Sequence, residues 1–276
     1  MPTRASFLIF SILLARCLGL CSEPPQEIPF ELKDGFIWIR VLSPQSARPL
    51  NFLLDSGAAT TTLNLQTASR LNIRKGNKVS VRGVDTTIEG FFPARFQAAV
   101  GEVRIPGRLL VVDLSALAQE CHCDVDGLLG ADFFRGRIVQ LDFARRTIRL
   151  LPSAPDPRGA EVLPLTFGRG AIRVPVEVNG KIGLVRLDTG CASSLEWVTQ
   201  NNVLPGESRR AVGLMSISVP TSSATLRIGK SLFPNLPIGV HQSEIFSGES
   251  GLLGMGILQR FSMITVDCRS GRLLLQ

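Results

Sequence analysis

The stretch that decides the fold is NFLLDSGAATTTLN, residues 51–64. It begins as an apolar strand, and Asp55 then stands where the apolar run would continue. Small residues and a run of threonines follow the acid. A carboxylate at the end of a buried strand is costly unless other groups stabilise it. The position of Asp55 therefore indicates a chemical role, and it raises the question of which part of the chain supplies a partner.

The second half of the chain repeats this stretch. GLVRLDTGCASSLEW, residues 183–197, again has an apolar strand, then Asp188-Thr189-Gly190, then small and hydroxyl residues. The correspondence extends upstream, where FIWIRVLSPQSARPLNFLLDSG (residues 36–57) parallels AIRVPVEVNGKIGLVRLDTG (residues 171–190). In each copy an alternating strand is predicted to turn back into the strand that carries the acid.

The two copies also agree downstream of the acids. VDGLLGADFFRGRIVQLDFARRTIRL (residues 125–150) parallels SGLLGMGILQRFSMITVDCRSGRLLL (residues 250–275), each with Leu-Leu-Gly and a later strand that ends in Asp. A Pro-rich stretch between the copies is a natural linker. The sequence therefore predicts two related all-β lobes, residues 23–153 and 160–276, joined by residues 154–159.

These paired motifs resemble the aspartic proteases of the pepsin and retropepsin type. Each lobe of that family carries Asp-Thr/Ser-Gly on a loop and a later apolar-apolar-Gly motif, which Leu128-Leu129-Gly130 and Leu252-Leu253-Gly254 match. A lone Asp-Ser-Gly is a common turn, but two copies with the same flanking strands are specific. The resemblance covers nearly all of the chain after its first residues. It implies an all-β, two-lobed acid-protease fold with the active site between the lobes.

The resemblance also implies a set of site residues. Asp55 and Asp188 become the catalytic pair, because two carboxylates that share one proton can both activate water and protonate a substrate carbonyl. This chemistry needs no metal and no cofactor. The residues expected to support the active loops are Ser56, Gly57, Thr189 and Gly190, with the motif glycines Gly130 and Gly254 behind them.

A flap hairpin should follow the first loop and close over the substrate. The candidate is VSVRGVDTTIEGFF, residues 79–92, and its turn residues are Gly83, Val84, Asp85 and Thr86. AVGLMSISVPTSS, residues 211–223, occupies the matching place in the second lobe. The chain contains no Tyr, so the flap Tyr characteristic of pepsins is missing. This departure favours a flap of the retropepsin type.

The first residues of the chain have the shape of a secretory signal. Arg4 precedes an apolar run over residues 7–15, and small residues and two prolines follow. We expect a signal peptide over residues 1–22 and export to the periplasm or the medium. A lipid anchor at Cys21 is the alternative, although Leu20 is larger than the usual lipobox residue.

Composition and charge exclude some function classes. The chain has 276 residues, 45% apolar and 19% charged, which is typical of a soluble globular protein. Its formal charge is +7, but the basic residues are scattered, so a nucleic-acid partner is not expected. Cys121-His122-Cys123 has the wrong spacing for zinc, and a loop with a disulfide is expected there. Cys191 takes the place of Ala58 and is expected to be a small packed residue.

The sequence thus predicts an exported aspartic endopeptidase that acts as a monomer on a polypeptide bound between its lobes. Two alternatives stay open. The chain could be a catalytically inactive peptide-binding protein on the same scaffold, since a fold does not guarantee an activity. The lobes could also pair between chains and form a dimer with two sites.

Overall fold

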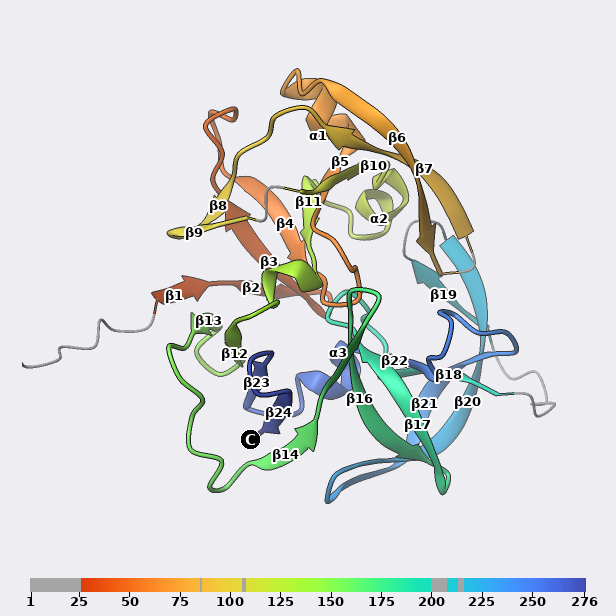
Figure 1. The fold of residues 1–276 in the computed structure, drawn as a ribbon. Coiled ribbons are helices and arrows are strands. Elements are labelled where there is room, and N and C mark those ends of the chain that lie inside the picture. The colour runs from red at the N-terminus through yellow and green to blue at the C-terminus, as the bar shows by residue number, and fades with distance from the viewer. Residues whose placement is uncertain (1–25, 85, 106–107, 200–207, 213–215) are drawn as a thin grey trace, which may run out of the picture.

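The structure is a computed structural model, and it describes residues 26–84, 86–105, 108–199, 208–212 and 216–276. These residues are mostly β-strand, as the sequence predicts, and they build two large sheets and a third sheet that takes strands from both halves. In Figure 1 the sheet of the N-terminal half lies at the top, that of the C-terminal half at the lower right, and the shared sheet at the lower left. The N-terminal half is here residues 26–153, and the C-terminal half is residues 160–276.

The N-terminal half forms an eight-stranded sheet. In sheet order its strands are β2 (Glu31–Lys33), β3 (Phe36–Val41), β4 (Leu50–Leu54), β11 (Gly127–Leu129), β5 (Thr62–Asn64), β10 (Leu110–Val112), β7 (Thr86–Pro93) and β6 (Lys75–Gly83). Short elements complete this half: α1 (Leu65–Arg70), β8 (Ala99–Val100), β9 (Val103–Arg104), α2 (Ser115–Glu120) and the 3₁₀ helix η1 (Ala131–Phe133). Asn64 caps α1 by accepting a hydrogen bond from the Gln66 amide.

The C-terminal half repeats this sheet strand for strand. In the same order its strands are β15 (Thr166–Gly168), β16 (Ala171–Val178), β17 (Lys181–Leu187), β22 (Gly251–Leu253), β18 (Leu195–Val198), β21 (Ser231–His241), β20 (Ser216–Ile228) and β19 (Ser208–Val212). Helix α3 (Met255–Leu258) follows β22 as η1 follows β11. β4 pairs in parallel with β11, and β17 pairs in parallel with β22. The internal repeat in the sequence is therefore an internal repeat in the fold.

The third sheet is shared between the halves. Its order is β1 (Gln26–Pro29), β13 (Thr147–Leu150), β12 (Ile138–Asp142), β23 (Met263–Asp267), β24 (Arg272–Leu275) and β14 (Glu161–Pro164). The central pair, β12 and β23, joins the N-terminal to the C-terminal half, and Ile138 lies opposite Asp267. One continuous set of buried apolar side chains runs through both halves. The predicted lobe and linker limits stay predictions, but these pairings hold the two halves together.

Two acids that the sequence places at the ends of strands are buried in this shared sheet. The Asp142 carboxylate accepts a hydrogen bond from the Arg145 amide at 2.8 Å. The Asp267 carboxylate accepts hydrogen bonds from the amides of Arg269 and Ser270, at 3.0 and 2.9 Å. Both acids therefore close the turns that follow their strands, as structural acids do.

Candidate active site

The two acids lie on loops that directly follow equivalent strands. Asp55 follows β4, and its amide donates to the Leu129 carbonyl of β11 at 2.9 Å. Asp188 follows β17, and its amide donates to the Leu253 carbonyl of β22, also at 2.9 Å. The two carboxyl groups lie close enough to change each other's pKa. The fold thus brings together two residues that are 133 positions apart in the chain.

Each acid packs against the glycine of the opposite loop. A Cβ atom at Gly57 would overlap the carboxyl group of Asp188, and one at Gly190 would overlap that of Asp55. Any other residue would therefore separate the halves or displace an acid. The two glycines allow the carboxyl groups to meet.

The hydroxyl residues next to the acids reach across between the halves. Ser56 Oγ donates to the Leu187 carbonyl, and Thr189 Oγ1 donates to the Leu54 carbonyl, both at 2.8 Å. Each hydroxyl also accepts the amide of the other residue: Ser56 N lies 2.9 Å from Thr189 Oγ1, and Thr189 N lies 3.1 Å from Ser56 Oγ. Ser56 and Thr189 are both buried. These four crossed hydrogen bonds fix the two loops relative to each other.

The motif glycines lie directly behind the loops. A Cβ atom at Gly130 would come within 2.9 Å of the Ala58 carbonyl oxygen, and one at Gly254 would come within 2.6 Å of the Cys191 carbonyl oxygen. The residues after these glycines hold the loops, because the Ala131 and Met255 amides donate to the same two carbonyls at 2.7 Å. Cys191 thus stands in the place of Ala58, as the sequence comparison predicts.

The surroundings of the two acids give them different proton affinities. Burial and then the nearby charge of Asp55 raise the pKa of Asp188 to about 8. Burial also raises the pKa of Asp55, but the Ala58 amide, which donates to it at 3.0 Å, opposes this increase. The pair can therefore hold one proton between its two carboxyl groups near neutral pH, with Asp188 as the favoured site.

Sequence reasoning missed Arg186, a charged residue beside the acids. It lies on β17 two positions before Asp188, and its Nη1 donates to the Gly57 carbonyl at 2.7 Å. Its side chain is 8% exposed and pairs with Glu249. An arginine within an otherwise apolar strand, VRL against FLL in the first copy, is the sequence signal that could have found it.

The predicted flap residues lie at the end of the β6–β7 hairpin. Gly83 ends β6 and pairs with Thr86, the first residue of β7, with Val84 between them and Asp85 outside the described residues. Arg82 Nη2 reaches the Ile245 carbonyl of the C-terminal half at 3.4 Å. The β19–β20 hairpin is its counterpart in the C-terminal half, and residues 213–215 of that hairpin are outside the described residues.

The cysteines do not follow the expectation of a disulfide. Cys121, Cys123 and Cys268 are free thiols. Cys121 directly follows α2 and packs in an apolar cluster with Leu114 and Leu117, and burial raises its pKa to about 12. Within the described ranges, no three His, Cys, Asp or Glu side chains gather as a metal ion would need.

The predicted signal peptide over residues 1–22, with Cys21, lies outside the described residues. No helix formed by the part of the chain that the structure describes is long and apolar enough to cross a membrane.

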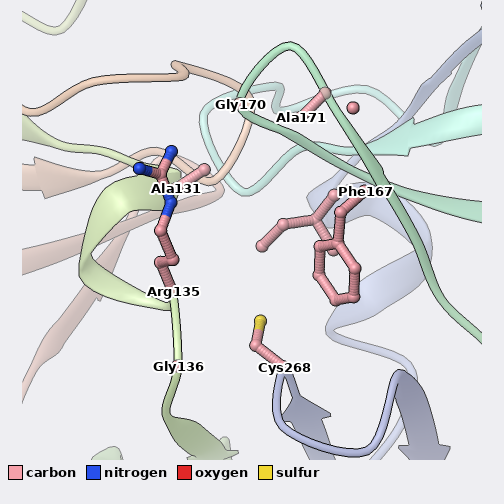
Figure 2. Close-up of a pocket in the computed structure, with 9 residues that line it drawn as sticks. Ala131, Arg135, Gly136, Phe167, Gly170, Ala171 and Cys268 are labelled. Carbon is pink, nitrogen blue, oxygen red and sulfur yellow. The ribbon is translucent and has the colours of Figure 1, made fainter.

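A hollow of about 340 Å³ lies between η1 and the β15–β16 hairpin. Figure 2 shows the ring of Phe167 and the thiol of Cys268 facing this space, with Arg135 on the opposite wall. Burial raises the pKa of the Cys268 thiol to about 12. The lining contains neither Asp55 nor Asp188, so the hollow is separate from the acid pair.

Comparison with known families agrees with this geometry. Residues 45–133 match the family model described as aspartyl protease. This match supports a retropepsin-like aspartyl protease family for the chain. The match covers the first acid loop, the β6–β7 hairpin and the first Leu-Leu-Gly motif. A search of curated proteins finds no match to the chain. The C-terminal copy is related to the matched region by its own repeat of sequence and sheet order.

Proposed function

We propose that this protein is an exported endopeptidase of the aspartyl protease type. It hydrolyses peptide bonds of a substrate that is bound between Asp55 and Asp188. The observation that carries the proposal is the meeting of the two acids on loops from the two halves, which crossed hydrogen bonds of Ser56 and Thr189 hold together. An inactive relative on the same scaffold would have no need for both carboxylates. The leader sequence supports the proposal of export.

The unequal proton affinities suggest a role for each acid. With one proton on the pair, Asp188 carries it and Asp55 is ionised. Asp55 then takes a proton from a bound water molecule while that water attacks the peptide carbonyl carbon, and Asp188 donates its proton to the carbonyl oxygen. The tetrahedral species collapses when its C–N bond breaks, the departing nitrogen takes a proton from Asp55, and a hydroxyl proton returns to Asp188. Both carboxyl groups end in their starting states.

The substrate in this proposal is a polypeptide held in the space between the halves. The β6–β7 hairpin of the N-terminal half reaches the C-terminal half at Ile245, as a flap over a bound chain would. One chain contains both acids, so a monomer is sufficient for one site.

The test is cleavage of a peptide library by the purified protein across roughly pH 3 to 8, the range over which carboxyl pairs titrate. Asp55→Asn is the matched control, because it keeps the size of the side chain and removes the acid. Cleavage by the wild type but not by the variant supports the proposal. Binding of a peptide-like transition-state mimic without any cleavage would favour the inactive binding protein.

Export is tested separately by the intact mass of the protein from its native host. A mature N-terminus between residues 21 and 26 supports a cleaved signal, and acyl chains on Cys21 would identify a lipoprotein instead. Retention of Met1 would contradict export. Mass measurement in solution distinguishes the monomer from a dimer paired between chains.

A further inference from the structure

Arg186 is held rigidly by its own half of the molecule. Its Nε and Nη2 atoms donate to the two carboxylate oxygens of Glu249 at 2.8 and 2.9 Å. Its guanidinium carbon lies 3.6 Å from the centre of the Phe246 ring. A planar fork on a carboxylate and a stack on an aromatic ring fix both the position and the plane of the group. Lysine could not reproduce this geometry.

The remaining nitrogen of the guanidinium points to the other half. Nη1 donates to the carbonyl of Gly57 at 2.7 Å, and Gly57 is the residue that packs against the Asp188 carboxyl group. Arg186 therefore connects the strand that carries Asp188 to the loop that carries Asp55. The N-terminal half has no reciprocal contact at this position, because Leu53, the register equivalent of Arg186, is apolar.

We propose that Arg186 is a positioning residue for the acid pair: it holds the Gly57 carbonyl so that the two loops meet, and it keeps a permanent positive charge beside both carboxyl groups. The role rests on the proposed function of Asp55 and Asp188. The charge opposes the effect of burial, because a nearby cation favours ionised carboxylates. Burial is the largest influence on both acids, and Arg186 lowers the pKa of each against it.

The other charged groups near this position do not cancel its effect. Glu249 is the anionic partner, and Arg173 Nε lies 3.4 Å from the same carboxylate. Two arginines thus share one glutamate, which leaves one net positive charge. Further charged or titratable groups are bound elsewhere: Asp132 to Thr61 on the N-terminal side, Glu196 to His241 on the C-terminal sheet, and Arg82 to Ile245 from the flap hairpin.

The experiment compares two substitutions that separate charge from geometry. Arg186→Leu reproduces Leu53 and removes both the charge and the bond to Gly57, while Glu249 keeps Arg173 as a partner. Arg186→Lys keeps the charge and loses the paired hydrogen bonds to Glu249. For Arg186→Leu we expect kcat to fall about tenfold or more, with a small change in KM, and both limbs of the pH–rate profile to move up by roughly one unit. For Arg186→Lys we expect a lower kcat with both limbs in place.

Hydrogen exchange of residues 55–58 provides a measurement that does not depend on turnover. Both substitutions should increase exchange in this loop, since both loosen the bond to the Gly57 carbonyl. A second such measurement is the melting temperature as a function of pH. The melting temperature should fall with rising pH until the acid pair is fully ionised, and the pH at which this fall ends should be higher in Arg186→Leu and unchanged in Arg186→Lys. If the wild type cleaves no peptide, the proposed function fails, and these two measurements still test the role of Arg186.

Several results would overturn the proposal. One is a folded Arg186→Leu protein with unchanged pH limbs and unchanged loop exchange. Another is an equal shift of the limbs in both variants, because the charge would then not be their cause. If Arg186→Leu does not fold, Arg186→Lys decides: wild-type kcat and wild-type exchange in the loop would exclude a positioning role.

Discussion

Leu53 in the sheet of the N-terminal half and Arg186 in the sheet of the C-terminal half occupy equivalent positions of the repeated fold. The sheet face around Leu53 is apolar, whereas the face around Arg186 is charged. In the N-terminal half, Trp38 lies opposite Leu53 across β3 and β4, and both pack with Val125 and Leu128 under helix α2. This face stabilises the folded protein through the burial of apolar surface.

In the C-terminal half, each of those positions but one is charged. Arg173 replaces Trp38, Arg186 replaces Leu53 and Glu249 replaces Val125, while Leu252 keeps the place of Leu128. The segment between β21 and β22 is shorter than its counterpart and forms no helix, so Phe246 covers the guanidinium of Arg186 instead of α2. The loops that hold the acids are alike in both copies, but their supports differ. A repeated active loop therefore does not need a repeated environment.

The largest expected effect tests whether the two acids are equal despite these different supports. Asp55→Asn and Asp188→Asn should each reduce kcat by roughly four orders of magnitude or more, and the double variant should be little worse, because the carboxyl groups act as a unit. Cleavage assays measure the loss, and thermal melting confirms that each variant is folded. Substantial activity in Asp188→Asn would make the second loop a structural copy without a catalytic role.

The next prediction exchanges the character of the two faces. Leu53→Arg places an unpaired charge in the apolar cluster of the N-terminal half and should cost about 3–5 kcal/mol in the free energy of unfolding. Leu53→Met, which changes volume little, should cost less than about 1.5 kcal/mol and is the control. Denaturant titration measures both. A small effect of Leu53→Arg would mean that this face can accept a charge as easily as the C-terminal face does.

The crossed hydroxyls should behave alike, since their contacts are symmetric. Ser56→Ala and Thr189→Val each leave a buried amide and a buried carbonyl without a partner, and each should cost about 1–3 kcal/mol. Thr189→Ser retains the hydroxyl and should lose less. If one of the two losses were negligible, the other hydroxyl would hold the loops, and the symmetry of the contacts would not extend to their energies.

The last expected effect is a pH dependence that distinguishes the two acids. Folded Asp188, with a pKa of about 8, keeps a proton that the unfolded chain loses above about pH 3.9. Its contribution to stability is therefore complete below about pH 3.9 and is lost as pH rises to about 8. Asp188→Asn should remove this decline, so the variant gains stability relative to the wild type at neutral pH. Melting temperatures from roughly pH 5 to 9 measure it.

Asp126 and Asp267 provide an internal control for this experiment. Hydrogen bonds lower the pKa of both acids against the effect of burial. Their contribution is present above the unfolded pKa and lost at acidic pH, so it does not overlap the window of Asp188. Identical curves for the wild type and Asp188→Asn above pH 5 would contradict the raised pKa of Asp188.

Much of the fold could be predicted because the same pattern of strands and motifs occurs twice in the sequence. One Asp-Ser-Gly is ambiguous, but its repetition with matching strands and a matching Leu-Leu-Gly predicts the family, the all-β class and the hairpin over residues 79–92. The family match and the strand content confirm the family and the fold class. The meeting of Asp55 and Asp188 follows from the same repeat, whereas their catalytic roles stay predictions.

The misses have a common physical cause: they depend on contacts between segments that differ in the two copies. Arg186 has no partner within its own strand, and its partners Glu249 and Phe246 are sixty or more residues away in a segment without a motif. Cys121 and Cys123 are close enough in sequence to suggest a disulfide, but α2 buries the first among apolar side chains. Neither result can be read from spacing alone.

The shared sheet has a consequence for synthesis of the protein. When the N-terminal half leaves the ribosome, β12 has β13 on one side and an open edge on the other, because its second neighbour, β23, follows only at Met263–Asp267 in the C-terminal half. An exposed strand edge can pair with other chains, so a stalled or truncated product should aggregate. Once β23 has been synthesised, it pairs with β12 and closes this edge.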